Sequence, residues 1–275
     1  MAEQTHEVNP PPSDTAPPFD TIRVGGIPFC VATLEGAVHW LIHDAARARL
    51  AVNVRLANAY NVALADREPA YGNLLSGDGV NFPDGLPVVW AMRAQARQLA
   101  PERVRGPSLF ASAMEAGVSQ GTKHFLLGST PETLSLLRQR LEKLHPGIRL
   151  VGSHSPPFAP VDPEYVRGCV DAVRGSGADI VWVGLGTPKQ DALGTALATR
   201  IGMPTVNVGA AFDFMAGTVK EAPRWVQNSG LEWLYRLASE PKRLWRRYFF
   251  GNARFLLVAL RNRSRAMADL TTQFD

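Results

Sequence analysis

Short apolar runs alternate with amphipathic stretches from about residue 27 to residue 210, and this alternation limits the possible folds more than any other feature. Between the runs, apolar residues recur at three- and four-residue spacing, which is typical of helices packed on one face. Thr130 before Pro131 and Asp162 before Pro163 are typical helix N-caps. The expected strands cover residues 27–32, 50–57, 80–82, 123–128, 149–152, 178–184 and 205–209. The sequence therefore predicts an α/β fold, a parallel sheet with helices on both faces.

Two segments lie outside this alternation and suggest a division of the chain. Residues 1–22 contain five prolines between positions 10 and 18, and we expect this segment to be disordered. Residues 23–218 then form the α/β domain, and residues 219–275 form a C-terminal appendage. The longest apolar run near the end covers only residues 255–260, far short of the roughly 20 residues that a transmembrane helix needs. Cys30 and Cys169 are far apart, as expected of buried thiols in a reducing cytoplasm.

The appendage carries an unusual excess of basic and aromatic residues. Between positions 220 and 265 we count eleven lysines and arginines against three glutamates, with tryptophan, tyrosine and phenylalanine interleaved. The pattern Ser229-x-x-Glu232 fits a capping box, and Pro241 and Gly251 are expected to divide the appendage into about three short helices. This composition favours contact with an anionic membrane surface. A packed helical subdomain with a solvated face, or a nucleic-acid-binding surface, would have a similar composition.

Asp84 is the first candidate for a chemical role. It follows a short buried strand that ends at Phe82, and Pro83 and Gly85 prevent the strand from continuing. The carboxyl ends of parallel strands form the edge where ligands bind in open α/β sheets. The carboxylate is therefore either catalytic or, more simply, the cap of the helix that begins near Pro87.

A second candidate is the glycine-rich segment from Gly184 to Gln190. It matches a dinucleotide-binding fingerprint poorly, because Lys189 replaces the third glycine. Thr187 and Gln190 fit a capping box, which is the purely structural interpretation. Gly184, Gly186 and the start of the following helix also present backbone N–H groups to an anion, and Lys189 adds positive charge. A diphosphate or a sugar hydroxyl would fit such a loop.

The sequence predicts neither a metal ion nor a cofactor. No D-x-D motif is present, and His39 and His43 have the right spacing for a metal but no third ligand nearby. The charge of a diphosphate would then be balanced by arginine, lysine and helix N-termini.

Four blocks of the sequence resemble the WecG/TagA/CpsF family of bacterial glycosyltransferases (glycosyltransferase family 26). The blocks are Asn81–Gly85 with Val89-Trp90, Phe125–Gly128, Val183–Gln190 and the long stretch from Val208 to Tyr248. The resemblance runs from about Val24 to Leu260 and implies a Rossmann-like catalytic core with an appendage that meets the membrane. It implies inverting, metal-independent transfer of a sugar from a UDP-sugar to a polyprenyl-diphosphate-linked sugar, in the synthesis of surface polysaccharides.

The resemblance also assigns roles to individual residues. Asp84 matches the proposed base of the family, and Asn58, Arg103 and Gln190 match positions that contact the sugar and nucleotide. The arginines of the appendage match the region that meets the lipid diphosphate: Arg236, Arg243, Arg246 and Arg247. Leu56 stands where the family usually has threonine, and Ser108 stands where an acidic residue is common.

The implied partners are a UDP-sugar, a lipid-linked acceptor and the inner face of the bacterial cytoplasmic membrane, with no nucleic acid. N-acetylmannosamine, its uronic acid and glucose are donor sugars within the family, and a homo-oligomer is compatible with the resemblance. A non-catalytic protein that binds a lipid-linked sugar at the membrane is the alternative. The incomplete glycine fingerprint and the lack of an expected ribose-binding acid argue against a nicotinamide-dependent sugar dehydrogenase.

Overall fold

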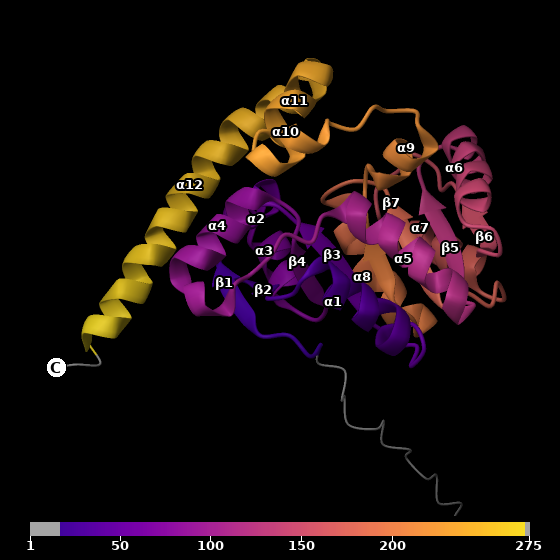
Figure 1. The fold of residues 1–275 in the computed structure, drawn as a ribbon, viewed down its shortest axis with the longest axis horizontal. Coiled ribbons are helices and arrows are strands. Elements are labelled where there is room, and N and C mark those ends of the chain that lie inside the picture. Colours follow the sequence, from indigo (N-terminus) through magenta and orange to yellow (C-terminus); the bar gives the residue numbers. More distant parts are fainter. Residues whose placement is uncertain (1–16, 273–275) are drawn as a thin grey trace, which may run out of the picture.

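The computed structural model describes residues 17–272, apart from the side chains of Arg97, Arg243, Arg246, Arg247, Tyr248, Phe250 and every residue after 261. Its centre is a six-stranded sheet in which every pair of neighbouring strands is parallel (Figure 1). In spatial order the strands are β4 (Val80–Pro83), β3 (Asn53–Ala57), β8 (Thr205–Asn207), β7 (Ile180–Gly184), β5 (Lys123–Gly128) and β6 (Arg149–His154). The predicted α/β class, with a Rossmann-like parallel sheet, is confirmed.

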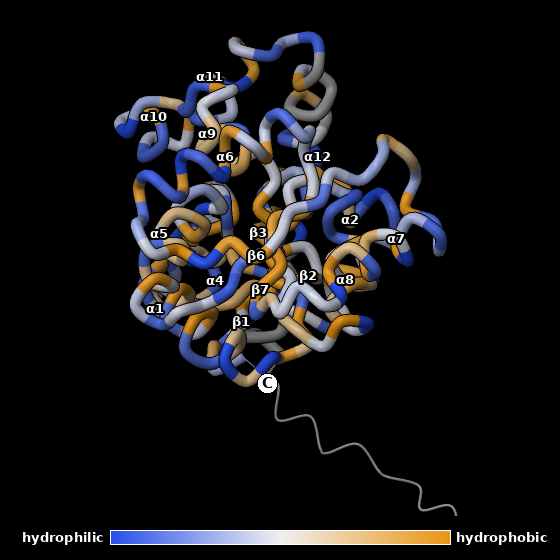
Figure 2. Tube along the Cα trace, turned by 90° about the vertical axis from the view of Figure 1, so that its right-hand side faces the viewer, coloured by the Kyte–Doolittle hydropathy of each residue, from blue (hydrophilic) through white to orange (hydrophobic). Residues whose placement is uncertain are grey.

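Side chains that alternate along the strands divide the core into two layers, and Figure 2 shows the hydrophobic strands near the centre of the molecule. Leu126 and Trp182 face one layer, whereas Phe125 and Val181 face the other. The first layer contains α1 (Leu34–His39), the π-helix η1 (Trp40–Ala45), α5 (Gly106–Gln120), α6 (Pro131–Leu144) and α9 (Ala211–Ala216). The second contains α7 (Pro163–Val173) and α8 (Lys189–Ile201). Cys30 and Cys169 are buried, as predicted.

The strand predicted at residues 27–32 does not join the parallel sheet. It is β2 (Ile27–Cys30), which pairs antiparallel with β1 (Thr21–Val24) in a separate hairpin. Gly25 and Gly26, both with positive φ, form the two-residue turn that brings the chain back. The hairpin packs in a further core with α2 (Ala59–Arg67), α3 (Pro69–Ser76) and α4 (Leu86–Gln95), and α4 is followed by the short 3₁₀ helix η2 (Arg97–Leu99).

Three helices follow α9 at the C-terminal end of the described chain: α10 (Arg224–Ser229), α11 (Glu232–Ser239) and α12 (Pro241–Thr272). The expected break at Gly251 is absent, because α12 runs through it. A Cβ atom at this position would lie 3.3 Å from Tyr60, so the glycine permits close approach of α12 to α2. Further along, Phe255 and Val258 of α12 are buried against the hairpin core, and Figure 1 shows α12 lying across α2 and α4. No helix in the described range 17–272 combines the length and hydropathy needed to cross a bilayer.

Candidate active site

The loops that follow the six parallel strands together line a cavity of about 650 Å³ at the carboxyl edge of the sheet, the main cavity. Parallel strands all end at this edge, and ligands of open α/β proteins bind there. One lining residue from each loop, in the order β3 to β8, is Asn58, Asp84, Ser129, Ser155, Gly186 and Gly209. The predicted candidates at Asp84, Asn58 and the 184–190 loop are thus brought together around one space.

Asp84 lies between the main cavity and a smaller cavity of about 90 Å³, and it lines both. Its Oδ1 atom accepts a hydrogen bond of 2.9 Å from the backbone N–H of Gly106, the first residue of α5. The expectation that Asp84 caps the helix near Pro87 is therefore wrong, because α4 is capped by Gly85 without a side-chain bond. Among the side chains that the structure describes, no donor reaches Oδ2 of Asp84. One oxygen is thus held in place, and the other is available to accept a proton.

Asn58 also lines both cavities, and its orientation is fixed by the start of α2. Its side-chain oxygen accepts a hydrogen bond from the N–H of Tyr60 at 3.0 Å, and its own backbone N–H donates to Asn61 at 3.1 Å. In the described part of the chain the Asn58 amide nitrogen donates to no protein group. This nitrogen can therefore donate to a sugar hydroxyl.

The loop between β7 and α8 differs from its predicted form. The N-cap of α8 is Pro188 and not Thr187. The prediction that Thr187 and Gln190 form a capping box is therefore wrong. The side-chain oxygen of Gln190 instead accepts a hydrogen bond of 3.0 Å from the N–H of Gly186. The N–H of Gly186, which we expected to face an anion, is therefore bonded within the protein. Lys189 still lines the main cavity, with its amino group 4.2 Å from the centre of the Tyr165 ring.

A buried polar network lies behind the site. The Tyr71 hydroxyl donates to Asp191 at 2.7 Å and accepts from the Asn61 amide at 2.8 Å, and Asn207 donates to the other Asp191 oxygen at 3.1 Å. Asn61 in turn accepts the backbone N–H of Asn58. The network therefore fixes the ends of β3 and β8 relative to α8. Its members come from α2, α3, α8 and β8, and no local motif identifies them as one network.

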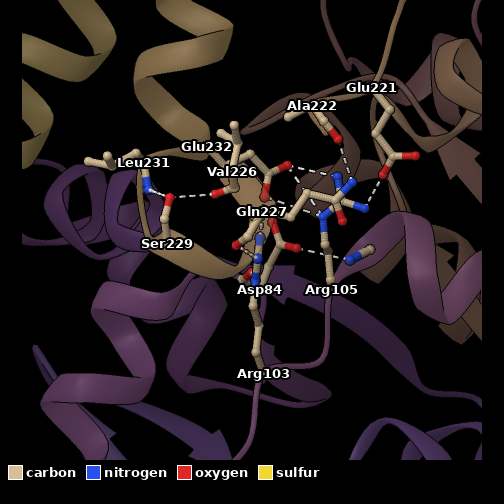
Figure 3. Close-up of polar contacts among 11 residues, drawn as sticks. Asp84, Arg103, Arg105, Glu221, Ala222, Val226, Gln227, Ser229, Leu231 and Glu232 are labelled. Atoms are coloured by element: carbon tan, nitrogen blue, oxygen red, sulfur yellow. Dashed lines mark hydrogen bonds and ion pairs between the residues drawn. The ribbon is translucent and has the colours of Figure 1, made fainter. Parts of the chain in front are cut away.

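Arg103 lines the smaller cavity, and each of its three guanidinium nitrogens donates to a protein group (Figure 3). Its Nε atom donates to the backbone oxygen of Asp84, and Nη1 donates to that of Gln227 at 3.0 Å. Nη2 pairs with Glu232 of α11 at 2.6 Å. Arg103 thus links the strand end that carries Asp84 to the C-terminal helices.

Glu232 is the centre of this ion-pair cluster. It also pairs at 2.7 Å with Arg105, which is buried and bonds Glu221 as well. Although burial opposes it, the hydrogen bonds and charges of Arg105 and Arg103 lower the pKa of Glu232. Burial likewise opposes the charge of Arg105, but Glu232 and Glu221 raise its pKa. The capping box predicted for Ser229 and Glu232 is wrong. The Glu232 carboxylate pairs with arginines instead, and α11 begins after Leu231.

The main cavity is lined by three cationic and three acidic side chains, so its charges balance. They are Asp84, Arg105, Lys189, Asp213, Glu232 and Arg236. Because Arg105 is held by two glutamates, Lys189 and Arg236 are the cations best placed for an anionic ligand. Arg236 lines both cavities and lies over the Phe214 ring, with 5.7 Å from its Cζ atom to the ring centre. Arg243, Arg246 and Arg247 are predicted to meet the lipid diphosphate, but their side chains lie outside the described part of the structure.

The two positions that depart from the pattern of the resemblance lie in different places. Leu56 is the penultimate residue of β3 and gives the main cavity an apolar wall where threonine would supply a hydroxyl. Ser108 lies within the first turn of α5 and lines a third cavity on the other side of Arg105. Among the described side chains, no group of three histidine, cysteine, aspartate or glutamate residues is placed to hold a metal ion.

A comparison with protein families gives a match that covers both the sheet and the C-terminal helices. The model of the family described as "Glycosyl transferase WecG/TagA/CpsF family" matches residues 22–269. The match therefore includes Asp84, both cavities and the ion-pair cluster at Glu232.

Proposed function

This chain belongs to the glycosyl transferase WecG/TagA/CpsF family, and on that premise we propose that it moves a sugar from a UDP-sugar to a polyprenyl-diphosphate-linked sugar. The position of Asp84 between two cavities is the observation that carries the proposal. The larger cavity suits the nucleotide donor, and the smaller one admits the attacking hydroxyl of the acceptor. Asp84 thus lies where the two substrates would meet.

In the proposed reaction, Oδ2 of Asp84 removes the proton of the acceptor hydroxyl as its oxygen attacks the anomeric carbon. The new carbon–oxygen bond forms on one face of the sugar, and the bond to the diphosphate breaks on the other. UDP leaves with the electron pair, and the configuration inverts. Glu232, the other carboxylate beside the smaller cavity, is a poor base because Arg103 and Arg105 stabilise its charged form and lower its pKa.

The other residues of the site would bind and orient the substrates. Lys189 and Arg236 lie along the main cavity and would neutralise the diphosphate of the donor, a role that metal ions fill in many sugar-nucleotide enzymes. The free amide nitrogen of Asn58 would donate to a hydroxyl of the transferred sugar. Gly184, Gly186 and Gln190 would shape the floor beneath it.

The C-terminal helices would bring the site to the membrane that holds the acceptor. They expose large apolar side chains at Trp225, Leu231, Leu234, Trp245 and Phe249. Aromatic and basic side chains on such helices suit the surface of an anionic bilayer. Trp233 and Asn252 of these helices also line the smaller cavity. We therefore assign residues 219–275 to an appendage on the inner face of the cytoplasmic membrane, and residues 23–218 to the catalytic domain.

The test is release of UDP from a panel of UDP-sugars in the presence of a polyprenyl-diphosphate-linked sugar. We expect release that depends on both substrates, and the preferred donor identifies the sugar. A non-catalytic binder of lipid-linked sugar would bind the acceptor and release no UDP from any donor, and that result would contradict the proposal.

A further inference from the structure

A third cavity, also of about 650 Å³, lies between α5, α6, α9 and α10, outside the site described above; we name it the lateral groove. Arg105, Pro107, Ala211 and Phe214 form the wall between it and the main cavity, because they line both. Asp84 lines the other two cavities but not this one. A ligand in the lateral groove would therefore lie away from the reacting atoms.

The rim of the lateral groove is strongly positive. Arg140 and Lys143 of α6 and Arg224 of α10 are exposed there, and no carboxylate among the described residues pairs with any of the three. The acidic residue on the rim, Glu221, is bonded to Arg105. Arg138, two residues before Arg140 on α6, differs from these three because it pairs with Glu142 at 3.0 Å. The groove therefore keeps a net positive charge that the protein leaves unbalanced.

The floor and the flanks of the lateral groove are apolar. Phe214 and Met215 line it from α9, and Ala111 lines it from α5. Beside the cationic rim, Leu144 is 59% exposed and Trp225 is 73% exposed, each directly following a rim residue in the sequence. Cationic groups next to exposed leucine and tryptophan are typical of a surface that meets both the headgroups and the acyl chains of lipids.

We propose that the lateral groove binds the headgroup of an anionic phospholipid. Its phosphate would lie between the guanidinium groups of Arg140 and Arg224 and the amino group of Lys143, since both kinds of cation bind phosphate oxygens. The glycerol would rest on Phe214, and Leu144 and Trp225 would lie beside the chains. A cavity of this volume is within the range of small-molecule sites. The inference does not rest on the glycosyl-transfer reaction.

The test uses the full-length protein and dihexanoyl phosphatidylglycerol below its critical micelle concentration, so that no membrane surface is present. Binding is measured by isothermal titration calorimetry for wild type and for the triple variant Arg140→Gln, Lys143→Gln, Arg224→Gln. The matched control is Arg149→Gln, Arg167→Gln, Arg200→Gln, which removes the same charge from exposed positions outside the three cavities. Thermal unfolding and UDP binding verify that each variant is folded.

We expect saturable binding to wild type, a loss of at least about tenfold in the groove variant, and a change below about twofold in the control. Dihexanoyl phosphatidylcholine and glycerol 3-phosphate should each bind at least about tenfold more weakly than phosphatidylglycerol. Equal binding by wild type and the groove variant would overturn the proposal. So would glycerol 3-phosphate binding as tightly as the lipid, because the groove would then be a site for soluble phosphates. Failure here leaves UDP release unaffected, so it is distinguishable from failure of the proposed reaction.

Discussion

Replacement of Glu232 by glutamine should loosen the C-terminal helices from the sheet. Glu232 joins Arg103 at 2.6 Å and Arg105 at 2.7 Å, and the three side chains are 16%, 17% and 7% exposed respectively. Glutamine preserves the shape and one acceptor oxygen but removes the charge that balances two arginines. Because α11 buries no side chain completely, we expect this ion-pair cluster to be a large part of what holds the helix in place.

The magnitude follows from the burial of the cluster. Removing one partner of a buried ion pair costs about 3–5 kcal/mol. The cluster is not fully buried, and Glu221 still pairs with Arg105, so we expect about 2 kcal/mol. That energy corresponds to about a 30-fold change in the equilibrium between docked and undocked helices. The control is Glu142→Gln, which breaks the exposed pair with Arg138 and should cost less than about 1 kcal/mol.

Amide hydrogen exchange measures this effect directly, because it reports local opening. In the Glu232→Gln variant, protection of the α10 and α11 amides should fall by about 30-fold, whereas the amides of β5 and β7 should change little. Glu142→Gln should leave the exchange of α10 and α11 unchanged. Unaltered protection of these helices in Glu232→Gln would refute the reasoning that the cluster holds them.

Three further predictions test other parts of the structure. Burial and, secondarily, the charge of His145 lower the pKa of His124 from 6.5 to about 4, so folding stability should decrease as the pH falls from 6.5 to 4. In urea unfolding, the free energy of unfolding should fall by about 3 kcal/mol more between pH 6.5 and pH 4 for wild type than for His124→Gln. Equal decreases in the two proteins would contradict the lowered pKa of His124. Tyr71→Phe should reduce the free energy of unfolding by about 1–3 kcal/mol, because it removes the hydroxyl that bridges Asn61 and Asp191; a change below about 0.5 kcal/mol would show that the network contributes little. Transfer should continue at the full rate in excess EDTA, and a loss that Mg²⁺ or Mn²⁺ restores would overturn the proposed metal independence.

The strands and several helix starts could be predicted from the sequence because local signals determine them. Thr130 and Asp162 do cap α6 and α7, accepting N–H groups at 3.2 Å and 2.8 Å. The two predicted capping boxes do not form for a common reason: their glutamate and glutamine bond groups outside the box. Glu232 bonds arginines 127 and 129 positions away, and Gln190 turns back to Gly186. Propensity selects the residue for a cap, but tertiary contacts decide where its side chain goes.

Much of the candidate site follows from topology alone. Once the strands are parallel, the residues after each strand must share one edge, and this places Asp84 and Asn58 beside the 184–190 loop. The cluster of Arg105, Glu221 and Glu232 could not be predicted, because no spacing rule joins residues more than a hundred positions apart. The separate hairpin at residues 21–30 does carry a local signal, because Gly25 and Gly26 are typical of a two-residue hairpin turn.

The most direct test of the proposed catalytic role is the turnover of Asp84→Asn. Asparagine retains an oxygen that can accept the N–H of Gly106, so the fold and donor binding should be preserved. Without a base for the acceptor hydroxyl, we predict that UDP release in the presence of both substrates falls by about 10²–10⁴-fold. Donor affinity, measured separately, should stay within a few-fold of wild type. A variant that is folded, binds the donor and retains more than about a tenth of wild-type turnover would contradict the assignment of Asp84 as the base.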